Sequence, residues 1–252
     1  MLEVIFLSII QGVAEFLPVS SSAHLVLISK YFNFNNESLT LDISLHLGSL
    51  LAITFYYKRD LVGFLVNRVL FYKILFSSIP VILFGYILIR LDLINFLRSY
   101  KVIGWSTVLF GALLYISDLA KIKKTINNDF KYSSAFYIGL FQILSLIPGV
   151  SRSGITITAG RFLNFSRSDS AKISFLISIP ALSAVSFFNI FNLYQANNFD
   201  LSFLNLSAVF LSFIFSYITI KYFLIYVKKF SLTIFVIYRI LLGSTILFFS
   251  YL

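Results

Sequence analysis

Long uncharged apolar runs alternate along the chain with short polar segments that hold most of its basic residues. The runs occupy residues 43–57, 74–89, 102–117, 132–151, 173–199, 201–220 and 230–252, the last interrupted by one arginine. Helices are the expected structure, because a helix of ~20 apolar residues crosses a bilayer and satisfies its own backbone hydrogen bonds there. We therefore predict an all-α polytopic membrane protein.

The overall composition agrees with this class and excludes others. Hydrophobic residues fill 59% of the 252 positions, charged residues fill 12%, and the mean hydropathy is +0.92. Such a chain cannot hide its apolar surface in a soluble core. The sequence has no cysteine, which excludes disulfides, thiol catalysis and cysteine-ligated metals. Its net charge of +10 would indicate nucleic-acid binding in a soluble protein, but the positions of the charges give another explanation.

The basic residues form clusters that predict the membrane topology. Four clusters lie in the segments 58–73, 121–131, 161–172 and 221–229. The positive-inside rule places them in the cytoplasm, so no nucleic-acid partner is needed to explain them. With 43–57 as the first full crossing, the later clusters fit only if 132–163 enters and leaves on the cytoplasmic side. By the same logic, residues 2–30 enter and leave from the outside.

We thus expect a single membrane domain, residues 1–252, with six transmembrane helices plus two re-entrant helical hairpins. An internal repeat supports this arrangement. At an offset of 131 positions, three residues recur in pairs: Gln11 with Gln142, Ser20 with Ser151, and Ser22 with Ser153. The first repeat covers about 1–120 and the second about 131–252, and they enter the membrane from opposite sides. Broken helices of such inverted-topology repeats meet near the bilayer midplane, where we expect the site.

Polar residues interrupt the first expected hairpin in the stretch QGVAEFLPVSSSAH, residues 11–24. Gln11 and Glu15 are four positions apart and project from one face of a helix. An ionisable residue within a membrane segment is a functional candidate by default, and this carboxylate suits a metal ligand or a general base. The alternative is a structural carboxylate, neutralised by a hydrogen bond or by an arginine.

The serines and the histidine of this stretch supply further candidate chemistry. Ser20, Ser21 and Ser22 follow Pro18, where they could cap a returning helix and offer hydroxyls and backbone N–H groups to an anion. His24 can exchange protons near neutral pH. The alternatives are a helix cap without further function and a histidine that is only a satisfied polar residue.

The second expected hairpin turns within LIPGVSRSGITITAGRF, residues 146–162. Its proline and first glycine break one arm, Ser151 and Ser153 can cap the next helix, and Gly154 permits close backbone approach. Arg152 then lies near the midplane, where its forked donors suit a phosphate. The structural alternative is an ion pair of Arg152 with Glu15 that ties the two repeats together. Both interpretations bring the turns of the two hairpins into contact. We call these turns the first tip, within residues 11–24, and the second tip, within residues 146–162.

Two other charged or titratable residues lie within the apolar runs. His46 follows Asp42 by four positions in the first crossing; it is a weaker candidate for the site, and the alternative is a polar packing residue. Arg239 lies within the last run, where we expect its long side chain to reach the cytoplasmic face.

At these residues the sequence resembles the undecaprenyl-diphosphate phosphatase family of bacterial inner membranes, the bacitracin-resistance type. The first signature of that family, Glu or Gln, three residues, Glu, then FLPVSS and a His, is matched by residues 11–24. Its second signature, PGxSRSG, is matched in full by residues 148–154. DISLHLGSLLAITFYYKRDL, residues 42–61, is also similar to the family, and the resemblance covers essentially the whole chain.

The resemblance implies removal of the terminal phosphate from undecaprenyl diphosphate. The product is the monophosphate lipid carrier for peptidoglycan and other envelope glycans. A divalent cation is also implied, Mg²⁺ in the first place and Ca²⁺ as the alternative. The site is expected to open to the outer, periplasmic face of the inner (cytoplasmic) membrane, in contact with membrane lipids. Whether the protein forms a homodimer is left open.

For the mechanism, we expect Ser21 as nucleophile, with His24 as general base and later acid. Arg152 would stabilise the transferred phosphoryl group, and Gln11 and Glu15 would hold the metal. The phosphate is expected to contact the remaining tip residues, which are Ser20, Ser22, Ser151, Ser153 and Gly154. One alternative uses Glu15 to activate water directly. Another is a lipid-phosphate transporter or flippase that uses the same anion site without hydrolysis.

Overall fold

The computed structural model describes residues 2–21, 23–25, 27, 39–64, 68–91, 93, 97–195 and 202–252. Ser22 and the part of the expected first hairpin that follows residue 27 lie outside the described residues. The described residues are organised as helices, with an isolated bridge between Lys124 and Phe165 in place of any strand. The prediction of an all-α protein is therefore confirmed.

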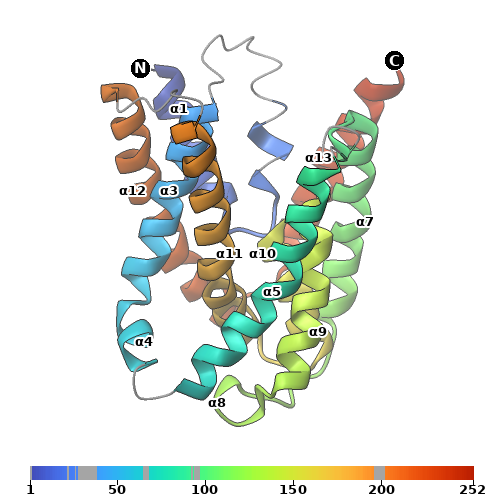
Figure 1. Ribbon diagram of the computed structural model, residues 1–252. Helices are drawn as coiled ribbons and strands as arrows, with labels where there is room; N and C mark the ends of the chain where they lie inside the picture. Colours follow the sequence, from blue (N-terminus) through green and yellow to red (C-terminus); the bar gives the residue numbers. More distant parts are fainter. Residues whose placement is uncertain are drawn as a thin grey trace.

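Five helices in the described chain are long and apolar enough to cross a membrane. They are α5 (Arg68–Arg90), α7 (Tyr100–Asp118), α11 (Arg167–Gln195), α12 (Phe203–Lys229) and α13 (Thr233–Tyr251). A further apolar helix, α3 (Leu39–Tyr56), is shorter and runs beside α12 (Figure 1). Large apolar side chains such as Phe210 and Phe249 are 64% and 70% exposed, which fits contact with lipid. The protein is a multi-pass membrane protein.

The remaining helices are short, and two pairs of them reverse direction. In the first pair, α1 (Leu2–Ala14) ends at a turn over 15–19, after which residues 21, 23–25 and 27 are helical again. In the second pair, α9 (Tyr132–Ile143) continues through a 3-10 turn (Leu144–Leu146), and α10 (Arg152–Phe162) runs back. Two further short helices, α4 (Lys58–Gly63) and α8 (Ile126–Asp129), lie at the end of the molecule opposite both chain termini (Figure 1).

Each hairpin packs against a long helix from the other half of the sequence. Helix α1 contacts α12, and α9 contacts α5. Glycines permit both contacts, because a Cβ at Gly12 would lie 2.5 Å from the Phe215 Cβ and one at Gly139 would lie 2.5 Å from the Ser77 carbonyl oxygen. Small residues let helix backbones approach closely in lipid, where no hydrophobic force drives helices together.

The buried core lies between the first tip and the long helices. Phe16 is fully buried and meets Phe175 of α11 edge to face, with ring centroids 5.3 Å apart. Serines on α3 and α12 form a polar contact, in which Ser49 Oγ lies 3.2 Å from Ser212 Oγ and 2.9 Å from Ser216 Oγ. The apolar contact fixes the tip against α11, while the serines join two helices by hydrogen bonds.

Candidate active site

Glu15 is the centre of a hydrogen-bonded group at the first tip. Its side chain is buried directly after the end of α1. Gln11 Nε2, one helical turn earlier, donates to Glu15 Oε2 at 3.1 Å, as the four-residue spacing predicts. Ser21 Oγ, on the far side of the turn, donates to the same oxygen at 2.8 Å. The carboxylate therefore receives hydrogen bonds from residues before and after the turn.

Arg152 brings the second tip to this carboxylate. It is the first residue of α10, and its Nη2 donates to Glu15 Oε1 at 2.8 Å in a nearly buried ion pair. The other terminal nitrogen, Nη1, is buried and has no hydrogen-bond partner in the described protein. The two tips thus meet, as both interpretations of the sequence predicted, and one arginine N–H group remains available to an acceptor.

The backbone is unusual at matched positions of the two tips. Ser20 and Ser151, which are 131 positions apart, have φ angles of 76° and 69°. This left-handed region is costly for residues other than glycine, and such strain clusters at functional sites. Ser151 also caps α10, because its Oγ accepts from the Gly154 N–H at 3.1 Å, as the sequence predicted. Ser153 Oγ donates to the Leu17 carbonyl at 2.8 Å, which adds a direct bond between the tips.

A cavity of about 190 Å³ lies beside these groups. Its lining residues come from both tips, α5 and α11: Ala14, Glu15, Ser20, Ser21, Val81, Ser145, Leu146, Ser151, Arg152, Ala181, Leu182 and Val185. Polar groups from the tips and apolar groups from the helices therefore share one cavity. Its volume is below the ~300 Å³ at which ordinary small-molecule pockets begin, so it suits a compact head group rather than a whole lipid.

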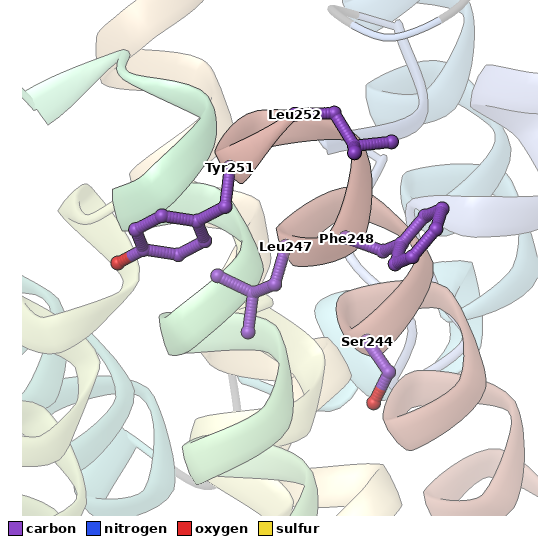
Figure 2. A pocket seen from close by; sticks show the side chains of 5 residues that line it. All are labelled: Ser244, Leu247, Phe248, Tyr251 and Leu252. Carbon is purple, nitrogen blue, oxygen red and sulfur yellow. The ribbon is translucent and has the colours of Figure 1, made fainter.

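A larger depression of about 430 Å³ lies at the C-terminal end of α13. Figure 2 shows its five lining side chains: Ser244, Leu247, Phe248 and Tyr251 come from the last turns of this helix, and Leu252 directly follows it. None of them carries a charge at neutral pH. The smaller cavity between the tips is consequently the candidate active site.

His24 does not join the hydrogen bonds around Glu15. Its Nδ1 bonds to the Ser20 carbonyl at 2.6 Å, and its Nε2 bonds to the Tyr238 hydroxyl of α13. The two rings are stacked, with centroids 5.6 Å apart. Because a carbonyl only accepts, Nδ1 must carry a hydrogen, and in the neutral ring Nε2 accepts from the tyrosine. The catalytic role of His24 stays a prediction.

His46, a weaker candidate in the sequence, lies at the site. Its Nδ1 is 2.9 Å from Gln11 Nε2 and 3.9 Å from Glu15 Oε2. The amide nitrogen of Gln11 is a donor, so Nδ1 accepts and Nε2 carries the hydrogen. Nε2 lies 3.7 Å from Asp42 Oδ1, one turn earlier on α3. The signal in the sequence was the pair of four-residue spacings, Gln11 to Glu15 and Asp42 to His46.

Arg239 does not reach the cytoplasmic face, and that prediction was wrong. The side chain is fully buried near the middle of α13 and bonds to backbone carbonyls of both tips. These partners are close enough to satisfy the guanidinium inside the protein, so it has no need to extend to the membrane surface.

The oxygen donors at the first tip fit part of a divalent-cation site. Gln11 Oε1 is buried without a hydrogen-bond partner in the described protein, on the side chain that already contacts Glu15. Within the described residues no three His, Asp or Glu side chains gather into a metal-holding group. Mg²⁺ is commonly held by one or two carboxylates together with substrate phosphates, so these donors fit a cation that shares its ligands with a bound phosphate.

The fold and this site define an integral membrane protein with a candidate anion-binding site between two helical tips. A comparison with protein families identifies the family of this membrane protein. The chain belongs to the family described as "Bacitracin resistance protein BacA", whose family model matches residues 4–245.

Relatives from several bacteria match the chain over nearly its whole length. The undecaprenyl-diphosphatase of Pelagibacter ubique is 50% identical over 248 residues, which cover 98% of this chain and 96% of the relative. The undecaprenyl-diphosphatase of Saccharophagus degradans is 38% identical, with 96% of each chain covered. The protein of the same name from Campylobacter curvus is 39% identical and covers 98% of this chain and 97% of its own.

Proposed function

We propose that this protein hydrolyses undecaprenyl diphosphate to undecaprenyl phosphate and inorganic phosphate. The family and the activity named for its relatives support this reaction. The observation in the structure that carries it is Arg152, which gives one terminal nitrogen to Glu15 and keeps the other buried without an acceptor. The unpaired Nη1 of this nearly buried guanidinium, in a cavity lined by serines, is a donor for a phosphate oxygen.

The hydrogen bond between Ser21 and Glu15 supports a nucleophilic mechanism. The Ser21 oxygen would attack the terminal phosphorus while its proton passes to Glu15, which already accepts that hydrogen at 2.8 Å. The bond from this phosphorus to the bridging oxygen would break, and the lipid monophosphate would leave with the bond electrons. The oxygen of a water would then attack the phosphorus of the phosphoserine and the bond to Ser21 would break, so that inorganic phosphate leaves and the Ser21 oxygen takes back the proton from Glu15. Arg152 would stabilise the negative charge on the transferred group in both steps.

Gln11 and Glu15 are the residues that would hold a divalent cation, Mg²⁺ or Ca²⁺. When bound, the cation would neutralise negative charge on the phosphate oxygens. His46 would keep the Gln11 amide in place, because His46 Nδ1 accepts a hydrogen bond from Gln11 Nε2. The Gln11 oxygen is then directed away from the histidine, because Nε2 and Oε1 are on opposite sides of the planar amide.

We further propose six transmembrane helices and two re-entrant hairpins, arranged as an inverted-topology repeat. The shared left-handed φ of Ser20 and Ser151 supports the repeat, as does the reciprocal packing of α1 on α12 and α9 on α5. Basic residues gather in α4, in the segment that includes α8, and at the end of α12, which supports a cytoplasmic position for that end. The site would then open to the periplasmic face of the inner membrane.

Phosphate release from undecaprenyl diphosphate by the detergent-purified protein tests the proposal. The wild type should release phosphate in the presence of Mg²⁺, and Arg152→Ala and Ser21→Ala should abolish the release. His24→Ala tests whether the histidine takes part. Detergent removes the two sides of a membrane, so a transporter without hydrolysis gives no signal in this assay. No release by a folded wild type, with Mg²⁺ or Ca²⁺, would refute the enzyme.

A further inference from the structure

Arg239 joins both tips of the site through backbone carbonyls alone. Within the described residues, none of the ion pairs includes it. Its Nε donates to the Thr107 carbonyl at 3.2 Å, and its Nη2 to the Gly149 carbonyl at 3.0 Å. Its Nη1 donates to Val150 at 3.0 Å and to Pro18 at 3.4 Å. Four carbonyls thus surround a guanidinium that is fully buried.

Three of these carbonyls, those of Pro18, Gly149 and Val150, lie one or two positions before a residue that lines the cavity. Pro18 precedes Ser20 and Ser21 in the first tip, and Val150 precedes Ser151 and Arg152 in the second. Arg239 itself does not line the cavity. One side chain behind the cavity therefore fixes the chain on both sides of it. The other ionic link between the tips, Arg152 to Glu15, uses groups that a bound phosphate would engage.

The bond to Val150 also orients a backbone donor. The described chain has no cis peptide bond, and the C=O and N–H of a trans peptide point in opposite directions. Arg239 holds the Val150 carbonyl, so the Ser151 N–H leaves from the opposite edge of the same peptide plane. Ser151 lines the cavity, and donors held in place before the reaction cost no reorganisation when charge develops.

The last glycine of the PGxSRSG motif makes room for this arginine. A Cβ at Gly154 would lie 2.8 Å from Arg239 Nη1, and 3.2 Å from both Cβ and Oγ of Ser151. The contact gives Gly154 a role that does not depend on a bound phosphate. A methyl group there would push against the guanidinium and against the serine that caps α10.

We propose that Arg239 is a positioning residue for phosphoryl transfer, which holds the two tips in register without touching the substrate. The proposal rests on the hydrolysis proposed above. Lysine would keep the positive charge but has a single nitrogen, so it cannot reproduce the forked set of bonds to four carbonyls. Arg239→Lys is therefore the informative variant.

Arg161 offers a matched control. It is also a buried arginine that donates to backbone carbonyls, those of Phe165, Asp118 and Ala120, but it lies at the far end of α10 from the tip. We expect Arg239→Lys to lower kcat for undecaprenyl diphosphate by ~10- to 100-fold with little change in KM, because misplacement of reacting groups by 1 Å has costs of this order. Arg161→Lys should keep the kcat of its folded fraction.

Thermal unfolding of both variants separates positioning from loss of fold. If Arg239→Lys keeps the wild-type kcat, or if Arg161→Lys at equal loss of Tm lowers kcat equally, the proposal is refuted. Gly154→Ala gives a second approach to the same contact. Combined with Arg239→Lys, it should add less loss of kcat than it causes alone, because both changes disturb one interaction.

A measurement without turnover tests the positioning of the tips independently of the reaction. We call the bonds of Arg239 to the carbonyls of both tips the clamp. The chain has no cysteine, so Ser21→Cys introduces a single thiol at the cavity. We expect Arg239→Lys to make this thiol react several-fold faster with an anionic methanethiosulfonate, and Arg161→Lys to leave the rate unchanged. Faster reaction in a protein whose wild type releases no phosphate would refute hydrolysis and keep the clamp. An unchanged or slower rate in a hydrolysing protein would refute the clamp alone.

Discussion

Ser21 Oγ lies 2.8 Å from Glu15 Oε2, to which it donates a hydrogen bond across the turn of the first tip. The other carboxylate oxygen accepts from Arg152 at the same distance. The buried carboxylate of Glu15 therefore connects Ser21, the candidate nucleophile, with Arg152, the candidate phosphate-binding residue. The positive charge of Arg152 compensates the negative charge of Glu15, so neither charge is left unpaired in the interior.

Replacing Glu15 with Gln should lower kcat by ~10²- to 10⁴-fold, the range expected when a positioned general base is lost. The amide keeps the shape of the side chain but cannot take the Ser21 proton. Phosphate release at saturating undecaprenyl diphosphate is the measurement. Glu15→Asp is the control for charge, because it keeps the carboxylate but moves it by one methylene. If Glu15→Gln retains more than a tenth of the wild-type rate, the carboxylate is not the base.

His46→Ala should lower kcat/KM more than Asp42→Asn does. The histidine contacts Gln11 and lies 3.9 Å from the Glu15 carboxylate, whereas the Asp42 side chain is 52% exposed. We expect His46→Ala to lower kcat/KM by roughly 10-fold, in line with the 10- to 100-fold effects of residues that orient metal ligands. The Mg²⁺ concentration for half-maximal activity should rise in the same variant. Equal effects of both substitutions would contradict this assignment.

Much of the site could be predicted from the sequence because its residues lie in two short motifs with matched spacing. Glu15 and Arg152 are charged residues that are costly in lipid without a partner, so their contact could be expected from their chemistry. The positions of His46 and Arg239 could not be predicted in this way. His46 is on a different helix from Gln11 and Glu15, and its four-residue spacing from Asp42 does not indicate which helix it faces. Arg239 bonds to backbone carbonyls, which every residue has, so the sequence does not identify its partners.

The contact of His24 with Tyr238 could not be predicted either, because nothing in the sequence relates two residues that are 214 positions apart.

The helices were predicted more reliably than the contacts of single side chains. The apolar run 102–117 corresponds to α7 (Tyr100–Asp118), since hydropathy alone determines such a segment. The run 173–199 missed the first turns of α11, because residues 167–172 are polar, except for Ala171, and still helical.

Asp118→Ala should destabilise the fold without a direct effect on chemistry. Asp118 accepts two hydrogen bonds from Arg167, at 2.6 and 3.0 Å, and one from the Leu232 N–H, and its carboxylate lies 3.6 Å from Arg161. Removing one partner of a buried ion pair costs about 3–5 kcal/mol, because the remaining charge is uncompensated. Thermal unfolding in detergent should show a clear loss of Tm, while kcat of the folded fraction is kept.

The control for this variant is Asp60→Ala. Its bridge to Lys172 spans 2.6 Å, but the two side chains are 30% and 36% exposed. Exposed ion pairs contribute only ~0–1 kcal/mol, so the Tm should change little. Equal losses of Tm in the two variants would show that burial of the Asp118 cluster is not what stabilises it.

Gly139→Ala and Gly63→Ala should have opposite effects on stability, although both replace a helical glycine. A methyl at Gly139 would lie 2.5 Å from the Ser77 carbonyl oxygen, so α9 and α5 must move apart, at a cost of about 1–3 kcal/mol for overpacking. At Gly63, at the end of α4, nothing lies within 4 Å of the added methyl. There the substitution should stabilise by ~0.5–1 kcal/mol, through helix propensity alone. Chemical denaturation in a fixed detergent measures both, and a loss of stability from Gly63→Ala as large as that from Gly139→Ala would refute the close contact as the cause.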